Sequence, residues 1–274
     1  MSIELTDSIA NSEYMLEHSL PHLEAGRLST LSHLLGFAVL YRRRGIARML
    51  VQGLPDPVFV AQMQAVSAFL HALPRVPEPE RVLSLAACLW DAIAGQYWDA
   101  ATELARLYPT HHNPKREHED DFLYVAFLLQ RYLLAPPADA EPERLEEHAA
   151  AELARLERWE EVLEGGLDPR LELCRALHEG DAGAFAEAIV SVSDARDEEL
   201  LQRHEDGVVT KEDLAWLRPV WPEGLALLRL AERDGLELGP LQVPRVPPLL
   251  RIDNPYAYYP DAWRSIDFRP ARRS

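Results

Sequence analysis

Apolar residues recur at intervals of three and four positions through most of this chain, which is the spacing that places them on one face of an α-helix. The clearest stripe consists of Phe59, Met63, Val66, Leu70 and Leu73. Asp56 stands where it can cap this helix and Pro57 stands at its first helical position. The pattern therefore predicts a helix that begins beside these two residues.

Two segments predict helical hairpins. Residues 82–93 carry an apolar stripe that ends at Gly95, and a second helix follows from Trp98. Further along, Asp168 and Pro169 repeat the cap-and-proline start before the apolar positions of residues 171–177, and residues 185–192 continue the pattern. Both segments contain an apolar helix, a short polar turn with glycine, an aromatic residue and an alanine-rich helix. Stacked helix pairs of this kind build α-solenoids and related bundles.

Single helices are predicted between the hairpins, over residues 122–133 and 145–163. A proline-rich break at 135–142 separates them and is the candidate boundary between two halves. From residue 236 to 274 the pattern changes, because prolines interrupt every helical run and aromatic residues stand between them. We predict a single all-α domain over residues 1–274. It is a solenoid-like bundle of helical hairpins with an extended C-terminal arm, 236–274, that packs back across the helical body.

The charge of the chain is strongly negative. Asp and Glu number 45 against 28 Lys and Arg, which gives a formal charge of -17. Such a surface attracts cationic partners and repels nucleic acid and anionic membranes, so we predict neither as a partner. The one basic run, Arg42 to Arg44, is too small to alter this prediction.

The sequence also indicates the cellular compartment. The first ten residues include Glu4 and Asp7 and have no basic region followed by an apolar run, so we expect no secretory signal. The longest apolar stretch, residues 31–40, is too short to span a membrane. Cys88 and Cys174 both lie in apolar helical patterns and are expected to be packed thiols. We therefore predict a cytoplasmic protein.

Histidines and acids concentrate in one short region that raises the question of a metal site. The members are His111, His112, His118, Glu119, Asp120 and Asp121. A divalent metal would require two helices to converge on them. The alternative is a solvated loop and helix start, where the helix dipole favours acidic residues. No second cluster has matching spacing, so we predict no metal and no cofactor.

Catalytic motifs are missing from the sequence. It has no Gly-x-Ser-x-Gly elbow, no Walker or dinucleotide-binding loop, and no cysteine with a local catalytic signature. We therefore predict that the chain is not an enzyme. A metal-dependent enzyme built around His111, His112, His118 and Asp121 stays open as a third hypothesis.

Three groups of residues are candidates for binding a protein partner. The first is the acidic helix within 141–164, represented by Glu157, Glu160, Glu161 and Glu164. The second is the run Glu119, Asp120 and Asp121, and the third consists of Tyr256, Tyr258 and Tyr259 in the arm. The acidic helix is also explained as a solvated face partly neutralised by Arg144, Arg155 and Arg158. The tyrosines are also explained by packing within the chain.

The order of features in residues 171–250 resembles a known family. It opens on Ala176-Leu177-His178-Glu179-Gly180-Asp181, followed by Phe185 and Ile189. After a polar segment come residues 222–231, Pro-Glu-Gly-Leu-Ala-Leu-Leu-Arg-Leu-Ala, then Gly235 and a proline-rich tail with Leu249 and Leu250. These motifs resemble the C-terminal half of the immunity protein 49 family of bacterial polymorphic toxin systems. The resemblance implies an all-helical protein, encoded beside a toxin, that binds the toxin and neutralises it without catalysis.

Besides the metal-dependent enzyme, two hypotheses of protein binding follow from these observations. The first is an immunity protein that occludes the active site of a cognate toxin, with a nuclease as the expected target because a nuclease cleft is basic. The alternative is a helical-hairpin scaffold that binds a protein partner in another pathway.

Overall fold

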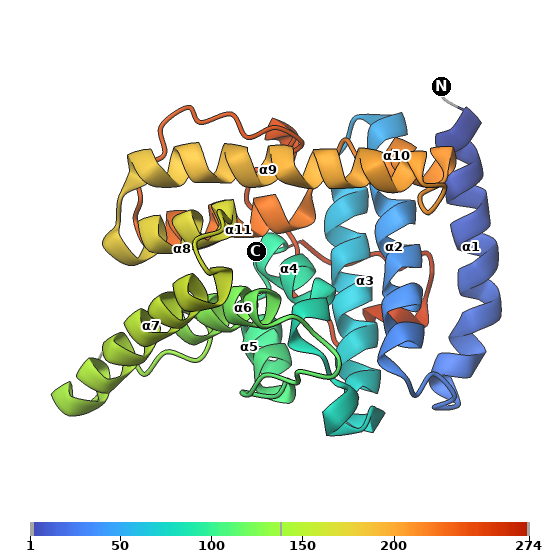
Figure 1. The fold of residues 1–274 in the computed structure, drawn as a ribbon. Coiled ribbons are helices and arrows are strands. Elements are labelled where there is room, and N and C mark those ends of the chain that lie inside the picture. Colours follow the sequence, from blue (N-terminus) through green and yellow to red (C-terminus); the bar gives the residue numbers. More distant parts are fainter. Residues whose placement is uncertain (1–2, 138, 273–274) are drawn as a thin grey trace.

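The computed structural model describes residues 3–137 and 139–272, and within them it confirms an all-α bundle of helical hairpins with an extended C-terminal arm (Figure 1). The helices are α1 (Ile3–Glu24), α2 (Leu31–Gln52), α3 (Asp56–Ala72), α4 (Ala87–Ala94), α5 (Trp98–Leu107), α6 (Glu119–Tyr132), α7 (Pro142–Leu163), α8 (Pro169–Glu179), α9 (Ala182–Glu205), α10 (Lys211–Leu217) and α11 (Pro222–Arg233). Short 3-10 turns lie between α3 and α4 and in the arm.

Helices α1, α2 and α3 stand side by side at one end of the molecule (Figure 1). Gly45 permits the close crossing of α2 and α3, because a Cβ there would lie 2.3 Å from the Cβ of Ala61 and 2.7 Å from the carbonyl oxygen of Pro57. The predicted start of α3 is corrected by one residue. Pro55 occupies the N-cap, and Asp56 lies in the first turn.

Both predicted hairpins form, as α4 with α5 and as α8 with α9. The first is shorter than its apolar pattern indicates. Residues 83–85 form a 3-10 turn, and the backbone N–H of Ser84 donates to the carboxylate of Glu117 instead of joining a helical ladder. In the second, Gly180 adopts a left-handed conformation with φ of 72°, and Asp181 caps α9 by accepting from the N–H groups of Gly183 and Ala184.

One continuous apolar core runs through residues from both sides of the 135–142 break. Across this break Glu152 of α7 is buried and pairs with Arg131 of α6 at 3.0 Å. Leu156 and Trp159 of α7 are buried in the core, whereas Leu145 and Leu153 are exposed. Figure 1 shows this N-terminal half of α7 extending away from the body.

The arm packs across the helical body, as its aromatic and proline content predicts. Trp263 is completely buried against α3. Its backbone carbonyl oxygen accepts from the hydroxyl of Tyr41 at 2.6 Å, and its backbone N–H donates to the hydroxyl of Ser67 at 3.0 Å. Two residues further along, the carbonyl oxygen of Ser265 accepts from the side chain of Gln64 at 2.6 Å. The arm is therefore an integral part of the folded body.

Three sequence features acquire a structural explanation. The basic run is used internally, since Arg42 pairs with Asp91, Arg43 with Asp213, and Arg44 with Glu13 and Asp267. Cys88 and Cys174 are buried free thiols, as predicted. Among the helices that the structure describes, none has the length and hydropathy needed to cross a membrane.

Candidate protein-binding surface

Two groups of acidic residues that are distant in the sequence meet on one surface. The N-terminus of α6, the C-terminal half of α7 and the N-terminus of α8 lie together. The carboxylates on these elements, named here the acidic surface, are Glu119, Asp120, Asp121, Glu157, Glu160, Glu161, Glu164, Asp168 and Glu172.

Arg170 fixes the centre of the acidic surface. Its guanidinium donates to Asp121 at 2.7 Å, to Asp168 at 2.8 Å and to Asp120 at 3.3 Å. The same group lies over the ring of Tyr124, 5.3 Å from the centroid, where the cation is attracted by the π-system. Burial alone would lower the pKa of Arg170, but the hydrogen bonds to Asp168 and Asp121 outweigh it and raise the pKa. The start of α8 is thereby tied to the start of α6.

Arg158 joins α7 to the same place. It donates to Glu119 at 2.8 Å and to Glu161 at 2.9 Å, and its hydrogen bond lowers the pKa of Glu119 below the ordinary value. Arg175 of α8 similarly bridges to Glu160 at 2.8 Å. These bonds bring the two predicted acidic groups, residues 119–121 and 157–164, into one continuous surface.

The acidic surface keeps a large negative charge despite these bridges. Arg158, Arg170 and Arg175 lie among nine carboxylates, and Glu157 and Glu164 form no ion pair with any residue that the structure describes. Spacing of three and four residues places Glu157, Glu160, Glu161 and Glu164 along one outward stripe of α7. All four are exposed.

Leu167 is a feature of this surface that the sequence patterns do not identify. Its side chain is 98% exposed in the loop between α7 and α8, directly before the cap residue Asp168. Gly165, with φ of 86°, and Gly166 precede it. The only sequence signal is that this leucine belongs to neither neighbouring helical stripe. This leucine adjoins the acidic surface at Asp168, where a partner that covers the carboxylates can also bury it.

The three candidate tyrosines are placed differently from one another. Tyr256 is buried and donates its hydroxyl to Asp56, so it fastens the arm to α3. Tyr258 is partly buried against Tyr97, with ring centroids 5.6 Å apart, and burial raises the pKa of its hydroxyl. Tyr259 is 50% exposed and stacks on Phe268. Only Tyr259 presents a large aromatic surface to solvent.

The histidines do not assemble with the acids. His112 contacts the carbonyl oxygen of Glu117 through Nε2 at 3.0 Å and lies beside Phe122, whereas His111 and His118 are exposed. Glu119 and Asp121 are engaged by arginines. Within residues 3–137 and 139–272, no group of three His, Cys, Asp or Glu side chains has the arrangement of a metal site.

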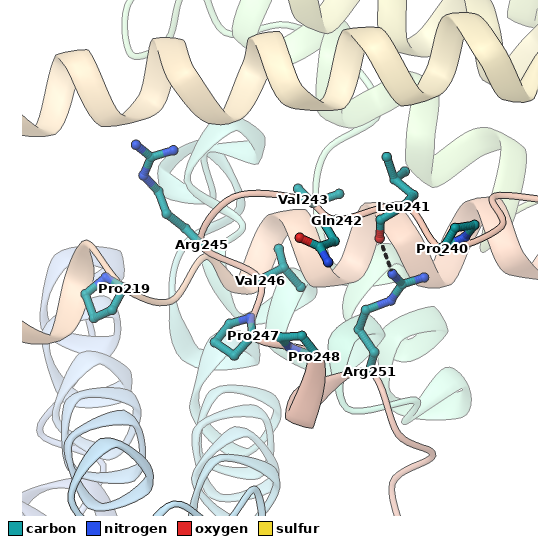
Figure 2. Close-up of a pocket in the computed structure, with 10 residues that line it drawn as sticks. All are labelled: Pro219, Pro240, Leu241, Gln242, Val243, Arg245, Val246, Pro247, Pro248 and Arg251. Atoms are coloured by element: carbon teal, nitrogen blue, oxygen red, sulfur yellow. Dashed lines mark hydrogen bonds between the residues drawn. The ribbon is translucent and has the colours of Figure 1, made fainter.

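A cavity of about 450 Å³ lies under the proline-rich start of the arm, between residues 240 and 251 and Pro219 (Figure 2). Its charged residues are used within the chain. Arg251 donates to the carbonyl oxygen of Leu241 at 2.6 Å, and Arg245 pairs with Asp197 at 2.6 Å. This cavity therefore offers few free polar groups for recognising a ligand.

A comparison of the chain with protein-family models, with curated proteins and with solved structures finds no match in any of the three.

Proposed function

We propose that this chain is a cytoplasmic immunity protein that binds a basic toxin and occludes its active site through the acidic surface. The observation that carries the proposal is the convergence of residues 119–121 and 157–164 on one face, with the exposed Leu167 in the adjoining loop before Asp168. A concentrated field of one sign accelerates the encounter with a partner of opposite sign.

The chemistry of the surface indicates the class of partner. A nuclease holds phosphates in a basic cleft, so carboxylates can replace the phosphates there. A partner with a basic rim around a small apolar pocket would fit both components of the surface. The carboxylates would set the association rate, and burial of the leucine by the partner would slow dissociation.

The family resemblance supports the same proposal through residues that form turns and close packing. In the phrase His178-Glu179-Gly180-Asp181, the last two residues end α8 and cap α9. In the phrase Pro222-Glu223-Gly224, a Cβ on Gly224 would lie 2.0 Å from the ring of Trp221, so this position requires glycine. These residues define the end of α8, the start of α9 and the close packing at the start of α11.

The test is a growth and binding experiment with the product of the neighbouring gene. That product is expressed alone and together with this chain, and cell survival is scored. If it is toxic and this chain restores growth, association rates are then measured between the purified proteins at low and high salt. The charge-reversal variant Glu157→Arg, Glu160→Arg, Glu161→Arg and Glu164→Arg should associate about ten- to a hundredfold more slowly at low salt.

The matched control reverses the same number of charges on α9, which runs along another edge of the molecule (Figure 1). The exposed residues are Glu187, Glu198, Glu199 and Glu205. An equal loss in both variants would mean that only net charge matters and would remove the acidic surface from the proposal. A neighbouring product that is harmless, and that does not bind, would favour the scaffold alternative.

A further inference from the structure

A second cavity, of about 190 Å³, lies where the end of α5 meets α6 and α7. Its wall is mainly apolar and includes Leu83, Ala105, Ala126, Leu129 and Leu134. An apolar cavity of about 150 Å³ accommodates benzene, so this one has room for a single ring or a branched chain of similar size.

Arg155 of α7 contributes a cation to this wall. Its Nη1 donates to the carbonyl oxygen of Ala126 at 2.8 Å, while Nε and Nη2 form no hydrogen bond with the described residues. Burial lowers the pKa of Arg155, and the attraction of Glu152 only partly opposes it. The carboxylate of Glu152 is itself engaged by Arg131 and His148, at 3.0 and 3.1 Å.

Arg155 forms no ion pair with a carboxylate of the described residues, a state that it shares with the partly buried Arg196, whose Nη2 donates to the carbonyl oxygen of Leu217. Arg196 does not line this cavity. The partly buried Arg42, Arg170 and Arg245 each have a carboxylate within 3.0 Å. Arg81 has no carboxylate partner either, but it donates to three backbone carbonyl oxygens. Arg155 therefore keeps two donor nitrogens for an anion beside an apolar cavity. A guanidinium in this state binds a carboxylate with parallel hydrogen bonds.

We propose that this cavity binds a small monocarboxylate whose apolar body is about the size of a benzene ring, with Arg155 holding the carboxylate. The apolar body displaces water from the wall formed by Ala105, Ala126 and Leu129, and the anion neutralises the unpaired guanidinium. Arg155 lies on the inward face of α7, turned away from the stripe of Glu157 and Glu161. The site is independent of the proposed toxin contact.

The test uses the full chain, with benzoate as the probe and benzamide as its neutral analogue of the same shape. Binding is followed by amide chemical-shift perturbation and by calorimetry. Millimolar benzoate should perturb the amides of Tyr108, Thr110 and residues 126–134. Benzamide should bind about tenfold or more weakly than benzoate, a difference of about 1.4 kcal/mol or more. Arg155→Gln should reduce benzoate affinity by a similar factor and leave the melting temperature unchanged or higher.

The matched control is Arg144→Gln, which removes an exposed arginine from the projecting half of the same helix. It should bind benzoate as the parent chain does. A second variant, Ala126→Leu, fills the apolar part of the cavity and should abolish binding of both probes. Equal affinity for benzoate and benzamide, unchanged affinity in Arg155→Gln, or no perturbation by benzoate would each overturn the proposal.

Discussion

Asp91 of α4 is completely buried, and both of its carboxylate oxygens accept hydrogen bonds from Arg42 of α2, the shortest at 2.5 Å. We predict that Asp91→Asn lowers the free energy of unfolding by about 3–5 kcal/mol, because it leaves the partly buried guanidinium of Arg42 without a counter-charge. Urea denaturation measures the loss. As a control, Asp261→Asn removes an exposed partner of Arg264 and should cost less than about 1 kcal/mol. Similar losses in the two variants would contradict the prediction.

Asp197 makes stability depend on pH. Hydrogen bonds from Arg218 and Arg245 lower its pKa from 3.8 to about 2 in the folded chain. Ionised Asp197 and its two arginine partners therefore stabilise the fold above about pH 4, and this contribution is lost as the pH falls from about 4 to about 2. Asp197→Asn should cost about 1 kcal/mol at pH 7, because Arg218 is half exposed and screened by solvent. The difference from the parent should shrink at pH 3; a difference independent of pH would contradict the assignment.

A substitution at Leu167 tests the proposed binding without affecting the stability of the fold. Because its side chain is 98% exposed, Leu167→Ala should leave the free energy of unfolding unchanged within about 0.5 kcal/mol. If this leucine is an anchor of the proposed complex, the same variant should weaken toxin binding by about 1–2 kcal/mol, mainly through faster dissociation. Surface plasmon resonance measures both rate constants. Unchanged dissociation would remove Leu167 from the interface.

At the scale of helices, two glycines of α2 differ in whether a larger side chain would fit. A Cβ on Gly45 would collide with Ala61 and the backbone of Pro57, whereas a Cβ on Gly36 would meet nothing within 4 Å. Gly45→Ala should therefore destabilise the α2–α3 pair by about 1–3 kcal/mol. Gly36→Ala should stabilise the chain by about 0.5–1 kcal/mol, because alanine has the higher helix propensity. Thermal unfolding of the two variants checks both signs.

The helices were the most predictable elements. Apolar spacing locates α6 and α7, and the pair Asp168 and Pro169 marks the start of α8, where the aspartate accepts from the N–H of Arg170. Residues 83–85 deviate because a side chain from another loop, Glu117, captures a backbone donor. Such a contact joins residues 33 positions apart, and local periodicity contains no information about it.

The candidate surface was predictable only in part, for the same reason. Spacing along α7 identifies the stripe from Glu157 to Glu164, and composition identifies residues 119–121. Their convergence depends on Arg158 and Arg170, which link positions 39 and 49 residues apart. Burial of Tyr256 likewise depends on Asp56, 200 positions away. Pairings at such distances are set by how helices pack, which the pattern of a single sequence does not specify.

At the scale of the whole molecule, the arm determines whether the chain unfolds as one unit. Trp263 is completely buried, lies 4.6 Å from the ring of His71, and completes hydrogen bonds to α2 and α3 through its backbone. If the arm belongs to the cooperative core, removal of the Trp263 side chain must destabilise helices that are distant in the sequence.

Trp263→Ala should accordingly lower the free energy of unfolding by about 3–5 kcal/mol, and the helices should melt in the same transition that releases the arm. Tyr259→Ala, four residues earlier and half exposed, should cost less than about 1 kcal/mol. Far-ultraviolet circular dichroism follows the helices, and hydrogen exchange at the backbone N–H of residue 263, which donates to the hydroxyl of Ser67, follows the docking of the arm. Coincident transitions in the tryptophan variant would establish that the arm and the helical body fold together. If the arm is released while the unfolding transition of the helices stays unchanged, its packing against α2 and α3 contributes little to the stability of the fold.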